Sequence, residues 1–206
     1  MRVIYDLIKI SFLTLLMMTI ITGLFYPALI TGLGTWWFDR QSHGDLSEHG
    51  AYFIGQNFSQ PCYFWSRPSA TSPFPYNAAS SSGSNLGPRN PELIKEVTAR
   101  VKRLHSYDPA NKKLIPIDLV TTSASGLDPD ISPAAADYQV SRVAHYRNLP
   151  LALVHKLVEE HITPRQLGFL GEPRVNVVQL NLALDRITQS HAGSRCQMIG
   201  KAQANS

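Results

Sequence analysis

The sequence predicts an α+β protein, in which one N-terminal transmembrane helix is followed by a single small soluble domain of mixed α/β structure. A long stretch without charged residues near the N-terminus predicts the membrane helix. Short aromatic segments bounded by Gly and Pro predict strands, and apolar residues at helical spacing behind Asn-Pro and Ser-Pro pairs predict helices.

The uncharged stretch runs from Ile10 to Phe38. A helix rises about 1.5 Å per residue, so about 20 apolar residues span a hydrocarbon core of roughly 30 Å. We therefore assign residues 10–34 to a transmembrane helix, 1–9 to a cytoplasmic N-terminus and 35–50 to an interfacial linker. A cleaved signal peptide is the alternative, but its apolar core would end after about 7 to 15 residues.

Three residues of this helix are candidates for packing against another membrane helix: Gly23, Tyr26 and Pro27. Glycine allows close approach, and proline leaves a backbone carbonyl without its helical donor. A lone helix with a kink is the alternative. Lys and Arg are more frequent before the helix than directly after it, which predicts a cytoplasmic N-terminus and an extracytoplasmic soluble domain at 51–189.

The first half of the soluble domain is predicted to hold strands at 51–56 and 62–65, followed by a long loop at 68–91. A loop of this length is either disordered or functional, and we expect an ordered one anchored by Phe74 and Tyr76. Asn90 and Pro91 start a helix with Leu93, Val97, Val101 and Leu104 on one face.

The second half is predicted to begin with a strand at 114–121 that contains a proline at an edge or end position. Ser132 and Pro133 start a helix that runs to about residue 147, and Asn148 caps another from 149 to 161. Thr163-Pro164 indicates a short helical turn. Residues 175–185 fit a helix better than a strand, and 190–206 are expected to form a frayed tail.

Enzymatic motifs are not found: there is no phosphate-binding Gly-x-x-x-x-Gly-Lys-Ser/Thr loop, no His-Glu-x-x-His and no Cys-x-x-Cys. The net charge of +4 is spread along the chain, so nucleic acid is not an expected partner. His155, Glu159 and His161 could bind a metal, but a solvated helix surface explains them better. Asp128 and Asp130 fit turn chemistry better than a calcium loop. Cys62 and Cys196 could pair, but their redox state is left open.

Several short motifs occur in a fixed order: Gly23-Leu24-Phe25-Tyr26-Pro27, Ile54-Gly55-Gln56, Arg67-Pro68-Ser69-Ala70, Ser82-Gly83-Ser84-Asn85-Leu86-Gly87, Ser123 to Pro129, Tyr138 to Ala144, Gly171 to Val177 and Leu180 to Asp185. Together they closely resemble the C subunit of the Kdp-type potassium-transporting P-type ATPase. The resemblance covers about residues 10–187.

The resemblance implies a non-catalytic accessory subunit of an ATP-driven high-affinity potassium uptake complex, required for its assembly and stability. It implies as partners a channel-like A subunit, an ATP-hydrolysing B subunit, a small F subunit and membrane lipid. It also implies a bacterial inner (plasma) membrane location. The alternative role is a catalytic chaperone that raises the affinity of the B subunit for ATP, with ATP bound only together with that subunit.

For the chaperone role, the resemblance assigns Ser125, Gly126 and Gln139 as nucleotide-binding positions, although a cytoplasmic nucleotide conflicts with an extracytoplasmic domain. A structural role for Gln139, as a helix polar group that bonds a neighbouring loop, remains the alternative. Five further residues are expected either to dock on a partner subunit or to satisfy turn backbones inside the domain: Arg67, Asn85, Asp128, Arg142 and Asn176.

Overall fold

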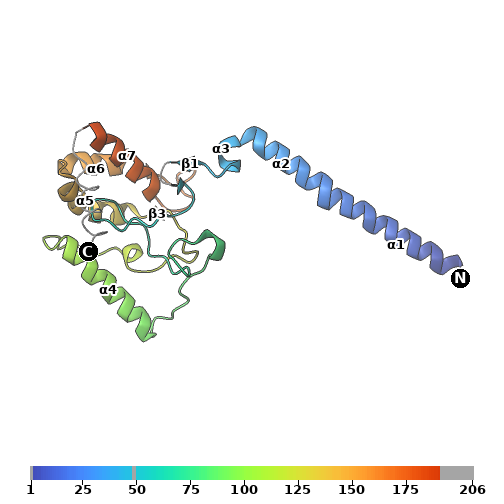
Figure 1. The fold of residues 1–206 in the computed structure, drawn as a ribbon, viewed down its shortest axis with the longest axis horizontal. Helices are drawn as coiled ribbons and strands as arrows, with labels where there is room; N and C mark the ends of the chain where they lie inside the picture. The colour runs from blue at the N-terminus through green and yellow to red at the C-terminus, as the bar shows by residue number, and fades with distance from the viewer. Residues whose placement is uncertain (1, 48–49, 191–206) are drawn as a thin grey trace. The chain divides into compact units, whose positions relative to one another are not determined.

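The computed structural model describes residues 2–47 and 50–190, and it divides into two compact units between Asp45 and Leu46 (Figure 1). All of the expected tail beyond Ser190, including Cys196, lies outside the described residues. Cys62 is disulfide-bonded.

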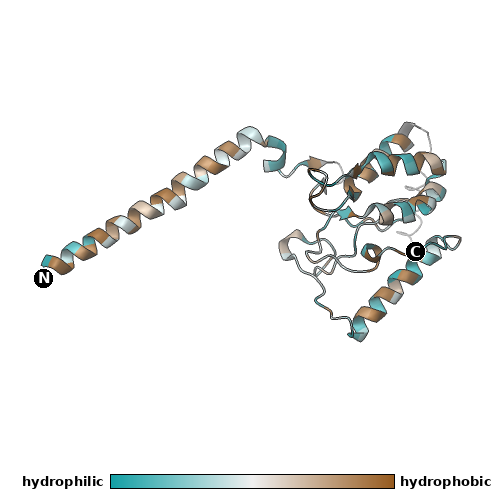
Figure 2. Ribbon diagram, turned by 180° about the vertical axis from the view of Figure 1, so that it is seen from behind, coloured by the Kyte–Doolittle hydropathy of each residue, from teal (hydrophilic) through white to brown (hydrophobic). Residues whose placement is uncertain are grey.

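The N-terminal unit is a long helix built from α1 (Arg2–Ile20), the π-helical turn η1 (Ile21–Phe25) and α2 (Tyr26–Trp37), followed by the short α3 (Asp39–Ser42). Arg2–Trp37 is long and apolar enough to cross a membrane, and none of its most apolar part is buried by the chain. Figure 2 shows hydrophobic residues along its length. An apolar surface without an internal partner distinguishes it from the core helix of a soluble protein.

The π-helical turn lies immediately before Pro27, at the position where the sequence predicts a freed carbonyl. The Tyr26 N–H bonds to the carbonyl of Ile21, five residues back. Proline has no N–H, and its ring would collide with the carbonyl four residues before it, that of Gly23. Widening the helix by one residue per turn accommodates the proline while the helix continues.

The soluble unit contains two small antiparallel sheets. In the first, β1 (Leu46–Ser47) pairs with β2 (Gly50–Ala51). In the second, β5 (Arg174–Asn176) lies between β3 (Asp130–Ile131) and β4 (Ile162–Thr163). Ile131 and Ile162 both face Val175 in the register, and Val175 is fully buried. The central strand therefore contributes its apolar side chain to the core.

Four helices enclose this core: α4 (Pro91–Tyr107), α5 (Pro133–Arg147), α6 (Leu151–Glu160) and α7 (Val177–Ser190). In Figure 1, α5, α6 and α7 lie together, while α4 runs along the other side of the unit. α5 is the central helix, because nine of its residues are buried. Mixed helices and short antiparallel strands confirm the expected α+β class for this unit.

The starts of α4 and α5 were predicted correctly, because their caps are local. The Asn90 side chain accepts a hydrogen bond from the Glu92 N–H, and Ser132 accepts one from the Ala135 N–H. Each cap precedes a proline in the first turn of its helix, α4 and α5 respectively. The predicted apolar face of α4 is also found, with Leu104 buried and Val97 and Val101 packed on the core.

The predicted strand at 62–65 is wrong, although the segment is buried: Cys62, Phe64 and Trp65 are at most 8 % exposed. Side chains from α5 and α7, instead of a neighbouring strand, satisfy its backbone. Asn181 bonds both the N–H and the carbonyl of Phe64, at 2.9 and 3.0 Å. Gln139 bonds both groups of Trp65, at 2.8 and 3.2 Å.

Two further strand predictions, one predicted helical turn, one predicted cap and one predicted helix start differ from the structure. Residues 114–121 contain the 3₁₀ turn η3 (Ile117–Leu119) in place of a strand, and only β2 occupies the predicted strand at 51–56. Thr163 belongs to β4 and does not start a helical turn. Asn148 ends α5 in a left-handed conformation (φ 54°) and does not cap α6, which begins after Pro150. The helix predicted at 175–185 begins at Val177, after β5.

Candidate docking site

The long loop at 68–91 is ordered by contacts with residues 122–130, and we call these two segments, together with the preceding Arg67, the loop platform. The Ser123 N–H bonds the Pro68 carbonyl at 3.1 Å, and the Ser82 N–H bonds the Ser125 carbonyl at 3.0 Å. The hydroxyls of Thr122 and Ser84 are 3.0 Å apart. The loop platform is thus held by backbone and hydroxyl contacts, consistent with its small polar composition.

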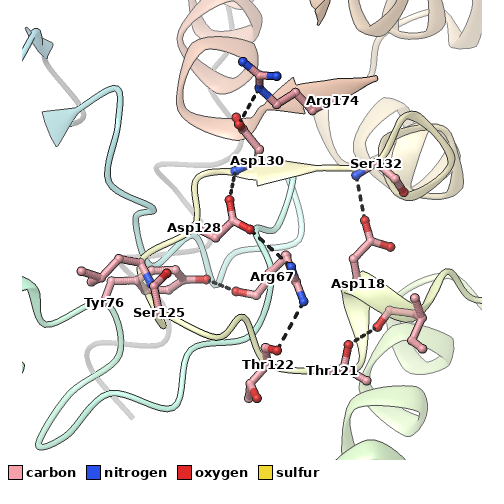
Figure 3. Close-up of polar contacts among 12 residues, drawn as sticks. Arg67, Tyr76, Asp118, Thr121, Thr122, Ser125, Asp128, Asp130, Ser132 and Arg174 are labelled. Carbon is pink, nitrogen blue, oxygen red and sulfur yellow. Dashed lines mark hydrogen bonds and ion pairs between the residues drawn. The ribbon is translucent and has the colours of Figure 1, made fainter. Parts of the chain in front are cut away.

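Arg67 and Asp128, both predicted docking residues, meet at the centre of the loop platform (Figure 3). Arg67 Nη1 donates to Asp128 Oδ2 at 3.3 Å, and Arg67 Nη2 donates to the Thr122 carbonyl at 3.3 Å. Asp128 Oδ1 accepts the Asp130 N–H at 3.0 Å. The two side chains therefore satisfy turn backbones, as the structural alternative predicted, and remain about one third exposed.

Asp130 connects the loop platform to β5 through an ion pair of 2.9 Å with Arg174 (Figure 3). Burial raises the pKa of the Asp130 carboxyl and outweighs the opposing effect of Arg174, while the neighbouring Asp128 raises it further. The ion pair with Arg174 holds the Asp130 carboxylate in place, although burial makes its charged form less favourable.

Tyr76 anchors the long loop from within. Its hydroxyl donates to the Arg67 carbonyl at 2.6 Å, and its N–H bonds Ser69 Oγ at 2.9 Å. Burial raises the pKa of Tyr76 to about 12, with a smaller contribution from Asp128 and an opposing one from Ser66. Phe74, the other expected anchor, is 57 % exposed and does not serve as one.

Of the predicted nucleotide positions, Ser125 and Gly126 belong to the loop platform. Gly126 has a positive φ of 68°, and a Cβ there would lie 2.5 Å from Thr71 Cγ2 and 2.8 Å from the Ser82 carbonyl. A glycine is required at this position because two loops cross at van der Waals distance. Ser125 is exposed, and its hydroxyl bonds the Leu127 N–H.

Gln139, the third nucleotide position, lies in α5 and is 1 % exposed. Both ends of its amide are occupied by Trp65, and its oxygen also accepts from Arg142 Nη2 at 2.6 Å. None of its described hydrogen bonds reaches Ser125 or Gly126, so the structure does not join the three positions. These contacts match the structural alternative for Gln139.

Arg142 is 2 % exposed and bonds the carbonyls of Pro61 and Tyr63. Its guanidinium lies 4.0 Å from the centre of the Trp65 ring. Burial lowers the pKa of Arg142 to about 9. Arg147 and Asn181, which sequence reasoning missed, hold the backbones of Cys62 and Phe64 in the same manner. In the sequence, the only sign of this role is that both residues are polar and lie on apolar helix faces.

The remaining two predicted residues, Asn176 and Asn85, have local structural roles. Asn176 caps α7, because its Oδ1 accepts the Gln179 N–H at 3.0 Å, and its Nδ2 donates to the Tyr52 carbonyl at 2.8 Å. Asn85 is exposed and has a left-handed backbone, with φ 51°. Asparagine tolerates that conformation better than most residues.

A surface loop at 165–171 was missed as a site. Gln166 and Leu170 pair through two backbone hydrogen bonds of 2.9 Å, and Arg165 and Glu172 close the base with an ion pair of 2.6 Å. Its tip displays apolar side chains: Leu167 is 84 % exposed, Phe169 68 % and Leu170 47 %. The sequence signal was the cluster Leu167-Gly168-Phe169-Leu170 between charged residues.

No group of three or more His, Cys, Asp or Glu side chains suited to a metal ion occurs in the described part of the chain. His155 instead lies 3.3 Å from Asp137 and 3.5 Å from Glu159, at a partly exposed helix surface. In the apolar N-terminal helix, Gly23 has only Thr19 near its Cβ position, at 3.9 Å.

Comparisons with known proteins agree with the motif order. The family model "K+-transporting ATPase, c chain" (KdpC) matches residues 8–186. The chain is 55 % identical over 184 residues to the "Potassium-transporting ATPase KdpC subunit" of Methylococcus capsulatus, covering 87 % of this chain and 97 % of that protein. It is 56 % identical over 178 residues to the protein of that name from Herpetosiphon aurantiacus, covering 84 % and 92 %. This chain therefore belongs to the KdpC family, the c chains of K+-transporting ATPases.

Proposed function

We propose that this chain is a non-catalytic accessory subunit of an ATP-driven potassium uptake complex and is required for the assembly and stability of that complex. Family membership and the relatives' name, "Potassium-transporting ATPase KdpC subunit", support a place in such a complex. The proposed partners are a channel-like A subunit, an ATP-hydrolysing B subunit and a small F subunit.

The observation that carries the docking role is the apolar tip of the loop at 165–171. Leu167 has a left-handed backbone with φ 52°, which costs a branched L-residue roughly 1–2 kcal/mol. The paired backbone of Gln166 and Leu170 holds this conformation and keeps Leu167 and Phe169 exposed. A rigid loop that presents large apolar side chains binds a partner with little loss of conformational entropy.

The occupant we propose for this tip is an apolar pocket on the extracytoplasmic face of the A subunit. Only a few side chains are displayed, which is too little for a stable interface alone. Large anchors of this kind contribute much of the binding energy when the surrounding rim excludes water. The tip would therefore act as one anchor within a larger contact.

The test is co-purification of the complex with Phe169→Ser or Leu167→Ser in this chain. Both side chains are exposed, so each change should alter the stability of the isolated chain by no more than about 0.5 kcal/mol. We expect recovery of this chain with a tagged A subunit to fall at least about tenfold.

The matched control is Leu114→Ser, since Leu114 is 93 % exposed and lies elsewhere on the unit. Its recovery should equal that of the unmodified chain. Equal recovery of all three variants would reject the loop as the docking anchor, and equal losses would show a general effect of removing exposed apolar groups.

We further propose that the N-terminus is cytoplasmic and the soluble unit extracytoplasmic, since Arg2 and Lys9 precede the apolar helix and only Arg40 follows closely. Protease treatment of spheroplasts should digest the soluble unit, and inverted vesicles should protect it. The reverse pattern would overturn the topology.

The alternative function is a chaperone that raises the ATP affinity of the B subunit. It requires the soluble unit to face the cytoplasm, so the same protease experiment separates the two functions. It also requires Gln139 to leave its contacts with Trp65 in order to reach a nucleotide.

A further inference from the structure

A cavity of about 210 Å³ lies between α4 and the loop at 57–76, outside the loop-tip site. Arg100, Arg103 and Leu104 of α4 line it, together with Trp65, Ser66 and Tyr76. This volume is well above the space that one water molecule needs. The cavity therefore has room for a ligand with a few heavy atoms.

The α4 wall of this cavity carries a cation without an acidic partner. Arg103 places its guanidinium 4.3 Å from the centre of the Trp65 ring and donates from Nη2 to the Ser59 carbonyl at 2.8 Å. No carboxylate lies within ion-pair distance of Arg103 in the described part of the chain. Arg100, one turn earlier, is paired with Glu96 at 2.8 Å and also bonds the Val120 carbonyl. The positive charge of Arg103 is thus not neutralised by the protein.

The lining also includes a buried hydroxyl, that of Ser66, without a hydrogen bond of good geometry. Ser66 is 7 % exposed, lines the cavity, and its Oγ has no hydrogen-bond partner within the described residues. It lies close enough to the Tyr76 phenol to lower the pKa of that group. Because a buried hydroxyl without a partner is costly, a ligand that accepts its hydrogen would be favoured.

We propose that this cavity binds a small oxyanion, such as a carboxylate or phosphate group, between the Arg103 guanidinium and the Ser66 hydroxyl. A guanidinium presents N–H donors in a planar fork that matches both groups. Trp65 forms a flat floor that already orients Arg103 through the cation–π contact. The site does not include the loop tip, so a negative result for anion binding would leave the proposed docking function untouched.

The fluorescence of Trp65 tests this proposal directly in the full chain in detergent. Trp36→Phe and Trp37→Phe leave Trp65 as the single tryptophan. Sodium phosphate and sodium acetate are titrated separately at constant ionic strength against sodium chloride. We expect a saturable change in Trp65 emission with at least one of the two anions, and the preferred anion identifies the ligand class.

Arg103→Gln should weaken the binding by about tenfold or more, because it removes a charge-assisted hydrogen bond. Ser66→Ala should weaken it about threefold or more and serves as the second variant if Arg103→Gln perturbs folding. Lys102→Gln is the control, since Lys102 is an exposed cation next to Arg103 on the same helix.

A linear response without saturation, or the response of the chloride control, would overturn the proposal by showing nonspecific screening. Equal weakening by Lys102→Gln and Arg103→Gln would also overturn it. Unchanged binding in both Arg103→Gln and Ser66→Ala would place any anion elsewhere and reject this cavity.

Discussion

Arg67 and Asp128 join two loops that are 61 residues apart in the sequence, through a hydrogen-bonded ion pair of 3.3 Å. The same carboxylate also accepts the Asp130 N–H, so one side chain orders both the turn that contains it and the loop that carries Arg67. Asp128 thus adds two side-chain bonds to the backbone and hydroxyl contacts that hold the loop platform.

Asp128→Ala should lower the free energy of unfolding by about 1–2 kcal/mol, because it removes both bonds at a site that is about one third exposed. Asp128→Asn keeps an acceptor for the Asp130 N–H and should cost less. Urea unfolding of the full chain in detergent measures both values. Equal costs for the two variants would mean that the backbone bond contributes nothing.

Gly126→Ala should lower the free energy of unfolding by about 3 kcal/mol, since it combines a positive φ of 68° with a contact of 2.5 Å to Thr71. Gly87→Ala is the matched control, because a Cβ at Gly87 would have nothing within 4 Å. The control should change stability by at most about 0.5 kcal/mol. Thermal unfolding of the two variants compares them, and a stable Gly126→Ala variant would contradict the close loop crossing.

Gln139→Ala should lower the free energy of unfolding by about 2–4 kcal/mol, because it leaves the N–H and carbonyl of Trp65 unpaired in the core. Gln179→Ala, an exposed glutamine on α7, is the control. Chemical denaturation and ATP affinity of the complex should be measured on the same preparations. Weaker ATP affinity with unchanged stability would favour the chaperone function over a structural role.

The raised pKa of Tyr76 predicts that the folded chain loses stability at alkaline pH. Its pKa is about 12 in the folded chain, against an ordinary tyrosine value of 10.0, so the unfolded chain releases the phenolic proton first as the pH rises. Stability from this group is complete below pH 10 and falls between pH 10 and about 12, by about 1.4 kcal/mol per pH unit.

The matched variant for this effect is Tyr76→Phe, which loses the hydrogen bond to the Arg67 carbonyl and should be less stable at pH 8 by about 1 kcal/mol. Because it has no phenolic proton, its deficit should shrink or reverse by pH 11. Urea midpoints at the two pH values measure the difference. A constant deficit would show that Tyr76 titrates normally.

The sequence predicted those elements whose signals are local. Caps at Asn90 and Ser132 and the apolar face of α4 depend on residues within a few positions, and the structure confirms them. The apolar helix near the N-terminus is equally local, since length and hydropathy alone indicate it.

Two of the strand predictions that failed depend on distant partners. Residues 62–65 have the aromatic composition of a strand, but Gln139 and Asn181 take up backbone bonds that a neighbouring strand would need. Residues 114–121 alternate in hydropathy, yet Leu114 and Ile117 are exposed while Leu119 and Val120 are buried. Tertiary contacts override composition in both segments.

The candidate site residues show the same difference between features that the sequence signals and features that depend on tertiary contacts. Motif order singled out Arg67, Asp128 and Gly126, and the structure brings them into one loop platform. The apolar tip at Leu167 and Phe169 was missed, because exposure of an apolar pair is decided by how the loop is held.

Assembly of the potassium uptake complex with and without this chain tests the central claim most directly. The other subunits, with a tag on the B subunit, would be purified from cells that contain or lack this chain and compared by size-exclusion chromatography and potassium uptake. We predict that the complex is lost without the chain and is restored by the unmodified sequence. A complex of unchanged composition and potassium affinity in its absence would contradict an accessory role in assembly.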